Sequence, residues 1–282
     1  MSNRRTVIAF VADTHTGHAT ALMPCDGWTD GMGNHTAPND FQDAIHGHWI
    51  SAWEKCRDLR QRSRLVVVHC GDAVEGKHHG ALGLSISEVI EQERAHLELM
   101  REALDITGRK RGDVVHYIMG TAAHGGESGS SEEIIIRALT KANEPERQLH
   151  RRLVATVNGV RFDIAHHGPS IGTRNWTRGN VLLATMRSMY IDCLESECDP
   201  PRFYVRAHRH VWQHRTLHDR NGRVVMDGFA LPSWKLKDDF AYMVAADALS
   251  NIGLVYVIVE PDGRTWWDDC RVDVQQDKVL TL

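Results

Sequence analysis

The hydrophobic positions in the first half of the chain form three short, continuous runs, separated by segments with helical periodicity. The runs are Val7–Ala12, Leu65–His69 and Val114–Met119, and each is rich in β-branched residues. Such runs are typical of strands that are covered on both faces. Between them, Phe41–Arg62 and Ser87–Leu104 carry apolar residues along one helical face. This alternation predicts a mostly parallel α/β layer arrangement.

Short strands and turns dominate the second half. Val154–Val157 and Val160–Ala165 flank Asn158-Gly159, a pair that favours a tight hairpin turn. One helix is expected near Asn180–Leu194. Further strands are expected at Phe203–Arg206, Val211–Leu217, Arg223–Met226, Leu254–Glu260 and within Thr265–Val274. Because no repeat or linker separates the halves, we expect a single domain over residues 1–282, with two sheets face to face and helices outside.

Composition excludes several classes of protein. With 42% hydrophobic and 25% charged residues, the chain is typical of globular proteins. A net charge of −4 does not favour a protein that coats nucleic acid or anionic lipid. No apolar run reaches the roughly 18 residues of a membrane span, and Asp13 ends the first run too early for a signal peptide. The cysteines form no C-x-x-C pair, so we expect free thiols and a cytoplasmic location.

Histidine is the outlier, with 18 of 282 residues, and it gathers with aspartate after predicted strands. Five strands are each followed by one such cluster: Asp13-Thr14-His15, Gly71-Asp72, Gly120 with His124, His166-His167-Gly168 and His208-Arg209-His210. Loops at the carboxyl ends of strands converge on one edge of an α/β sheet. We therefore expect these side chains to meet. Carboxylate oxygens and neutral imidazoles suit manganese, zinc or iron, so the pattern predicts a metal site.

The order of these clusters resembles the calcineurin-like metallophosphoesterase superfamily, whose hallmark is D-x-H, G-D-x-x-(D/E), G-N-H-(D/E), H and G-H-x-H. The resemblance spans about residues 7–211. It implies a four-layer α-β-β-α sandwich of two mixed sheets around a dinuclear centre. It also implies hydrolysis of phosphodiester or monoester bonds by attack of a metal-bridging hydroxide. The implied cofactors are two divalent transition-metal ions, with manganese as the first choice and zinc, iron or nickel as alternatives.

Carried over by position, the resemblance assigns Asp13, His15 and His210 to the first ion, with Asp72 bridging to the second. It assigns the second ion to His208 and one histidine of the His166-His167 pair. We expect His166 to be that ligand, because it is the first residue after the strand, and keep His167 as the alternative and as a candidate substrate contact. His124 takes the role of the catalytic histidine near the leaving group, as a general acid or charge stabiliser.

The third motif departs from the family pattern, because Gly120-Thr121-Ala122-Ala123-His124 lacks the expected asparagine. Water, the Thr121 hydroxyl, Glu75 or Glu127 could replace this second-metal ligand, and we expect the second ion to bind more weakly. The fifth motif has Ala207 in place of glycine. The G-T-x-x-H variant and the His78-His79 loop after Asp72 are similar to versions in phage and prophage metallophosphoesterases.

Other features have a functional and a structural interpretation. His78, His79 and Arg178 are candidate contacts to a phosphate-ester substrate, which could be a nucleotide or a nucleic acid. We expect Trp234 in the core, His96 at the surface and Arg60 on the solvated face of the first helix. The sequence indicates no membrane partner, and it gives no indication of the oligomeric state. Two alternatives remain open: a manganese-dependent DNA nuclease of the same superfamily, and a degenerate phosphoesterase fold that serves as a binding scaffold.

Overall fold

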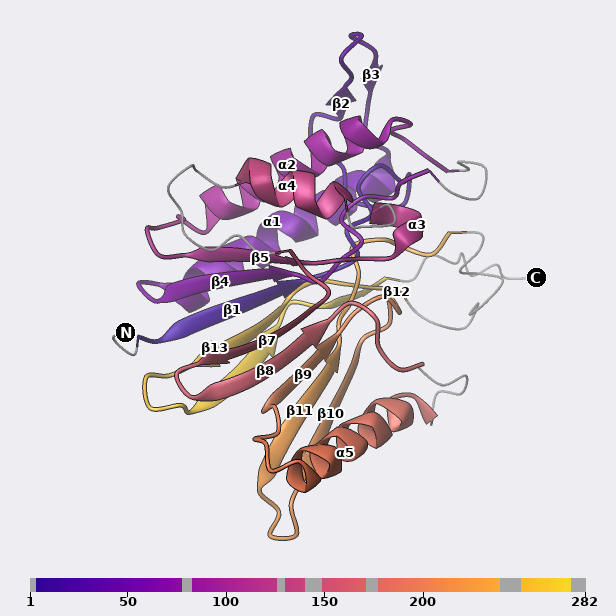
Figure 1. The fold of residues 1–282 in the computed structure, drawn as a ribbon. Coiled ribbons are helices and arrows are strands. Elements are labelled where there is room, and N and C mark those ends of the chain that lie inside the picture. Colours follow the sequence, from indigo (N-terminus) through magenta and orange to yellow (C-terminus); the bar gives the residue numbers. More distant parts are fainter. Residues whose placement is uncertain are drawn as a thin grey trace, which may run out of the picture.

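The computed structural model describes residues 4–77, 83–125, 130–139, 149–170, 177–238 and 250–274. Two β-sheets lie face to face, with helices on the outer face of each (Figure 1). The layer order helix–sheet–sheet–helix confirms the predicted four-layer sandwich. Among the described helices, none combines the length and the apolar character that a membrane span requires.

The first sheet has six strands, and its central part is parallel. Its strands, in spatial order, are β14 (Thr265–Asp269), β13 (Val255–Val259), β1 (Thr6–Val11), β4 (Arg64–His69), β5 (Val114–Ile118) and β6 (Leu149–His150). β1, β4, β5 and β6 run parallel to one another, whereas β13 pairs antiparallel with β1 on one side and with β14 on the other. Helices α1 (Asp40–Arg60), α2 (Val89–Ile106) and α4 (Ser130–Leu139) cover its outer face (Figure 1). Asn39 starts α1 with a capping box to Gln42.

The second sheet has five strands and is mixed. Its order is β10 (Gln213–His218), β11 (Val224–Ala230), β9 (Phe203–Arg206), β8 (Val160–Ala165) and β7 (Arg152–Val157). The hairpin of β7 and β8 is confirmed, with positive φ at Asn158 and Gly159 as a primed turn requires. β9 is parallel to both β8 and β11. Helix α5 (Asn180–Glu195) covers the outer face of this sheet (Figure 1).

Apolar side chains fill each space between layers. Between the two sheets, the rings of Phe162 and Phe203 stack with centroids 4.9 Å apart, and Phe10 lies 6.5 Å from Phe162. Beneath α1, the buried rings of Trp49 and Trp234 meet edge to face at 5.0 Å, so Trp234 is a core residue as predicted. These two cores pack the sheets against each other and the helices α1, α2 and α4 against the first sheet.

Several short elements escaped prediction. They are β2 (Trp28–Thr29), β3 (His35–Thr36), α3 (Ala122–Gly125), β6 (Leu149–His150) and β12 (Ser250–Ile252). β11 also extends past its predicted end at Met226 to Ala230. This extension contains Asp227 and Gly228, although Asp and Gly are depleted in strands. The Asp227 carboxylate is paired with Arg202 at 2.6 Å. A Cβ at Gly228 would lie 2.3 Å from the Met186 sulfur of α5.

Two predicted surface residues are buried. His96 on α2 has no exposed surface, and its ring nitrogens hydrogen-bond to the hydroxyls of Thr16, at 3.2 Å, and Tyr117, at 3.0 Å. Arg60 at the end of α1 forms an ion pair with Asp113 at 2.8 Å and is 1% exposed. Both buried polar side chains are partnered, and these partners explain why the surface predictions are wrong.

Candidate metal centre

The polar clusters after β1, β4, β5, β8 and β9 meet at one edge of the sandwich. Backbone hydrogen bonds continue from the strands into the loops: the Asp13 amide donates to the Gly71 carbonyl and the His15 amide to the Asp72 carbonyl, both at 3.0 Å. On the second sheet, the Ala207 amide donates to the His166 carbonyl at 2.9 Å. Backbone hydrogen bonds between neighbouring loops therefore fix the positions of these residues.

The backbone is strained at most of the predicted ligands. Among the described residues, eight residues other than glycine have positive φ. Five of these are predicted metal ligands: Asp13 (51°), His15 (45°), Asp72 (51°), His208 (73°) and His210 (53°). Each such conformation costs on the order of 1–3 kcal/mol and persists only where the surrounding structure imposes it. This concentration of strain indicates a functional site.

Two motif glycines allow the loops to approach closely. A Cβ at Gly71, whose φ is +95°, would lie 2.5 Å from His166 Nδ1. A Cβ at Gly120 would lie 2.2 Å from Asp72 Oδ1. Real Cβ atoms cannot come this near, so glycine is required before Asp72 and before Thr121 for these loops to bring their ligands together.

A first group of side chains consists of Asp13, His15 and His210, with one ligand atom of each within 4.8 Å of the others. The Nε2 atoms of His15 and His210 are 3.1 Å apart, and His210 Nε2 is 3.5 Å from Asp13 Oδ1. Burial lowers the pKa of His15 to about 3, so its ring is neutral at physiological pH. Burial alone would raise the pKa of Asp13, but His210 and His166 hold it below its usual value. Both groups are thus in the protonation state that binds cations.

A second group gathers around Asp72. The Asp72 Oδ2 atom lies 3.1 Å from His166 Nε2 and 4.0 Å from both His208 Nδ1 and His15 Nε2. The same carboxylate oxygen therefore faces ligands of both groups. Burial opposes ionisation of Asp72, yet the contact with His166 Nε2 and the nearby rings of His208 and His15 hold its pKa well below the usual range.

His166 is the histidine of its pair that faces Asp72. Its Nδ1 donates to the Cys70 carbonyl at 2.7 Å, which directs Nε2 toward the cluster. Although burial lowers its pKa, the hydrogen bond with Asp72 and the charges of Asp13 and Asp72 raise it to about 9. His167 is exposed, and its ring lies 4.6 Å from that of His208 at the rim of the cluster.

Side chains around the two groups orient them. Glu75 accepts a hydrogen bond from His15 Nδ1 at 2.8 Å, and its oxygens lie 3.1 and 3.2 Å from Lys235 Nζ. Burial would raise the pKa of Glu75, but His15 and Lys235 hold it well below the usual range. His124, on α3, donates from Nδ1 to the Glu75 carbonyl at 2.6 Å and meets the His15 ring edge to face at 4.5 Å.

For four further candidates, the described part of the structure shows no contact with the cluster. His78, His79 and Glu127 lie outside the described residues. Arg178 precedes α5, where its carbonyl accepts a hydrogen bond from Arg215. Its side-chain Nε has no hydrogen-bond partner among the described residues, and within the same part of the chain no ion pair joins it to Asp72.

Sequence reasoning missed the orienting roles of Lys235, the Cys70 carbonyl and Glu75. Only Glu75 carries a local signal, since it occupies the acidic position of G-D-x-x-(D/E).

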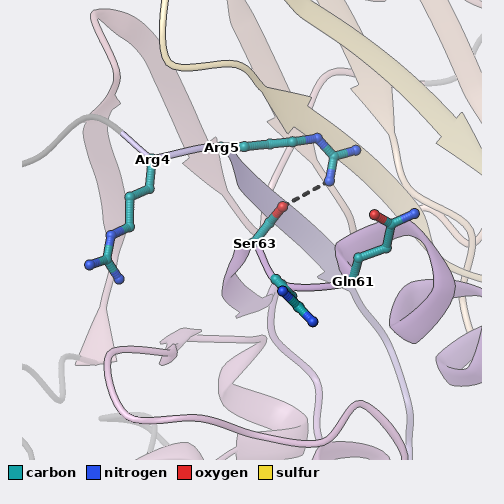
Figure 2. Close-up of a pocket in the computed structure, with 5 residues that line it drawn as sticks. Arg4, Arg5, Gln61 and Ser63 are labelled. Atoms are coloured by element: carbon teal, nitrogen blue, oxygen red, sulfur yellow. Dashed lines mark hydrogen bonds between the residues drawn. The ribbon is translucent and has the colours of Figure 1, made fainter.

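A basic surface hollow lies at the opposite ends of β1 and β4 (Figure 2). Arg5 donates to Ser63 Oγ and to the Leu59 carbonyl, both at 2.9 Å, and pairs with Glu260 at 3.1 Å. Its guanidinium thus joins three segments of the chain. The hollow lies at the first residues of β1 and β4, whereas the metal-ligand cluster lies beyond their last residues, so the two sites are at opposite ends of these strands.

No family model and no curated protein sequence matches this chain. Among solved structures, an archaeal protein described as a novel phosphodiesterase is similar at 12% identity and a TM-score of 0.41, over 93% of this chain and 99% of that one. Vps29 from Entamoeba histolytica, in a complex with Zn²⁺, is similar at 10% identity and a TM-score of 0.36, over 95% and 98%. PhoD is similar at 12% identity and a TM-score of 0.42, over 93% and 65%. These values are low, so our functional proposal depends on the residues of this chain.

Proposed function

We propose that the protein is a metal-dependent phosphoesterase of the calcineurin-like type, with a dinuclear centre. The observation that carries the proposal is the position of Asp72, whose one carboxylate oxygen faces His166, His208 and His15 at 3.1, 4.0 and 4.0 Å. A buried carboxylate between two sets of imidazoles is the arrangement that a bridging ligand requires.

The residues fit two cations. Asp13 Oδ1 is buried and has no hydrogen-bond partner among the described residues, although it lies within 4 Å of two histidine rings. His15 donates from Nδ1 to Glu75, so its Nε2 faces His210 Nε2 with a lone pair at 3.1 Å. A cation bound here would satisfy Asp13 Oδ1, which has no hydrogen-bond partner among the described residues, and would be held by the same imidazole nitrogens. Oxygen and imidazole donors without thiolate favour manganese, with zinc, iron or nickel as alternatives.

Asp13, His15 and His210 would hold one ion, His166 and His208 the other, and Asp72 both. When bound, the ions supply electrostatic stabilisation of the phosphoryl oxygens and acidify a water molecule. The chain orients these ligands: Glu75 fixes the His15 tautomer and the Cys70 carbonyl fixes that of His166.

His124 would donate a proton to the leaving group. Because its Nδ1 donates to the Glu75 carbonyl, Nε2 is the nitrogen that would carry this proton. The ring lies 4.5 Å from that of His15, at the edge of the ligand cluster. A phosphate ester held by the cluster would therefore place its departing oxygen next to a general acid, or next to a group that stabilises its charge.

The strained backbone argues against a scaffold that has lost its site. Five ligand positions with positive φ destabilise the fold, and a binding scaffold has no need for them. The nuclease alternative gains no specific support from the described residues, and it becomes one arm of the test.

The test is a panel of esters and metals applied to purified, chelator-treated protein. Aryl phosphomonoesters, aryl phosphodiesters, and single- and double-stranded DNA are each incubated with Mn²⁺, Ni²⁺, Zn²⁺ or Mg²⁺. We expect hydrolysis of a small ester with a transition metal and at least a hundredfold loss in Asp72→Asn. Cleavage of DNA alone would establish the nuclease. Equal turnover by Asp72→Asn would contradict the mechanism.

A further inference from the structure

The second group of ligands has one protein oxygen fewer than the family motif provides, because the motif asparagine is absent. We propose that the Thr121 hydroxyl is the fourth protein ligand of the second ion and takes the place of that amide. This inference depends on the proposed dinuclear function and identifies a ligand specific to this chain.

The hydroxyl lies among the other second-site donors. Thr121 Oγ1 is 3.1 Å from Asp72 Oδ2, 3.3 Å from His166 Nε2 and 3.3 Å from His208 Nδ1. Donor atoms that share one ion at about 2.1 Å are about 3.0–3.4 Å apart at octahedral or tetrahedral angles. The three separations therefore match those of ligands around a single cation.

The backbone fixes this position. The Thr121 amide donates to Asp72 Oδ1 at 2.5 Å, and the Thr121 carbonyl accepts from the amides of His124 and Gly125, both at 2.9 Å, at the start of α3. Gly120 lets the Thr121 segment approach Asp72, because a Cβ at this glycine would lie only 2.2 Å from Asp72 Oδ1. A short side chain at this point reaches the cluster without an extended rotamer, which suits threonine.

Two rival donors, Glu75 and His167, lie near the second group. Glu75 binds His15 and Lys235 on the side of the first group. His167 offers a ligand atom within 4.8 Å of those of His166 and His208, but its side chain is exposed. Thr121 is half-buried, and its Oγ1 lies within 3.3 Å of ligand atoms of His208, His166 and Asp72. A neutral hydroxyl also contributes less charge than a carboxylate, so the second ion is bound more weakly than the first.

The experiment measures Mn²⁺ binding to the full chain after chelator treatment, by calorimetry and by elemental analysis after dialysis. Thr121→Val removes the hydroxyl at constant shape, Thr121→Ser retains it, and Thr121→Asn restores the family amide. His167→Ala tests the rival ligand. Thr185→Val on α5 is the matched control, because the Thr185 hydroxyl donates to the Val181 carbonyl of its own helix. Thermal unfolding of the metal-free variants identifies any that fail to fold.

We expect wild type to bind two ions, and Thr121→Val to weaken the second at least tenfold without changing the first. Thr121→Ser and Thr121→Asn should keep the second ion. The visible absorption of Co²⁺ bound in the second site should change in Thr121→Val but not in Thr121→Ser. This absorption reports the ligands of the ion, and loss of a hydrogen bond that does not involve the ion would leave it unchanged.

Two ions in wild type with unchanged binding in Thr121→Val would overturn the assignment of Thr121 alone. So would loss of the second ion only in His167→Ala. A wild-type protein that binds a single ion would overturn the dinuclear function, and the Thr121 inference with it.

Discussion

Replacement of Lys235 by methionine removes the cation that compensates a buried carboxylate. Lys235 Nζ lies 3.1 and 3.2 Å from the two Glu75 oxygens and 2.7 Å from Asp238 Oδ2, and its side chain is 7% exposed. Removal of one partner of a buried ion pair costs about 3–5 kcal/mol, because the other charge stays desolvated. We therefore expect Lys235→Met to lower the free energy of unfolding by that amount.

The same substitution should weaken the first metal. Glu75 orients His15 through the 2.8 Å hydrogen bond to Nδ1, and the loss of such orienting contacts lowers metal affinity about 10–100-fold. Without Lys235, the Glu75 carboxylate loses one of the positive groups that, after His15, keep its pKa low, so its pKa rises and it is held less firmly in the position that orients His15.

The assay is urea unfolding of the chelator-treated protein, combined with Mn²⁺ calorimetry. The matched control is Lys77→Met, which breaks a 2.7 Å ion pair with Glu88 whose side chains are 46% and 60% exposed. This exposed pair should contribute less than about 1 kcal/mol. Double replacement with Glu75→Gln should cost less than the sum of the single changes. If Lys235→Met is as mild as the control and leaves the first metal unchanged, the buried network is not what orients His15.

Three further predictions concern stability. Because the pKa of His166 is raised to about 9 in the folded protein, its protonated ring stabilises the metal-free protein by about 3 kcal/mol below pH 6.5. This contribution is lost as the pH rises through 9. Urea unfolding from pH 6 to 10 should show the loss, and His166→Gln should give a flatter profile. Burial lowers the pKa of His96 to about 3, so stability should fall by about 1.4 kcal/mol per pH unit for this site as the pH drops from 6.5 toward 3, which acid titration of unfolding measures. Phe162→Ala, between the sheets, should cost about 3–5 kcal/mol in urea unfolding, whereas Val154→Ala, exposed on β7, should cost less than about 1 kcal/mol; equal effects would contradict the assignment of the core.

The strands that carry the ligands were predictable because their signals are local. Continuous β-branched runs identified β1, β4 and β5, and Asn158-Gly159 identified the hairpin that ends before His166. Once these strands were placed, the polar residues at their carboxyl ends could be expected to converge, and the structure brings them together.

The orienting contacts were not predictable, because they join residues that are distant in the sequence. Lys235 is 160 residues from Glu75, and no periodicity or motif connects them. His96 sits at a polar position of α2, and its burial is evident only from the hydroxyls and the Tyr117 ring that surround it. Arg60 continues a basic stripe of α1 but turns inward to Asp113. Burial of a polar side chain depends on partners that a single segment does not contain.

The central claim is that two ions, held by the residues around Asp72, make this chain a phosphoesterase. The most direct test titrates Mn²⁺ into chelator-treated protein and measures the hydrolysis of an aryl phosphodiester or monoester at each step. Our account predicts that hydrolysis rises with added metal and reaches its maximum only when two ions are bound per chain. Protein that binds two ions but hydrolyses neither ester, or that reaches full activity with one ion, would contradict it.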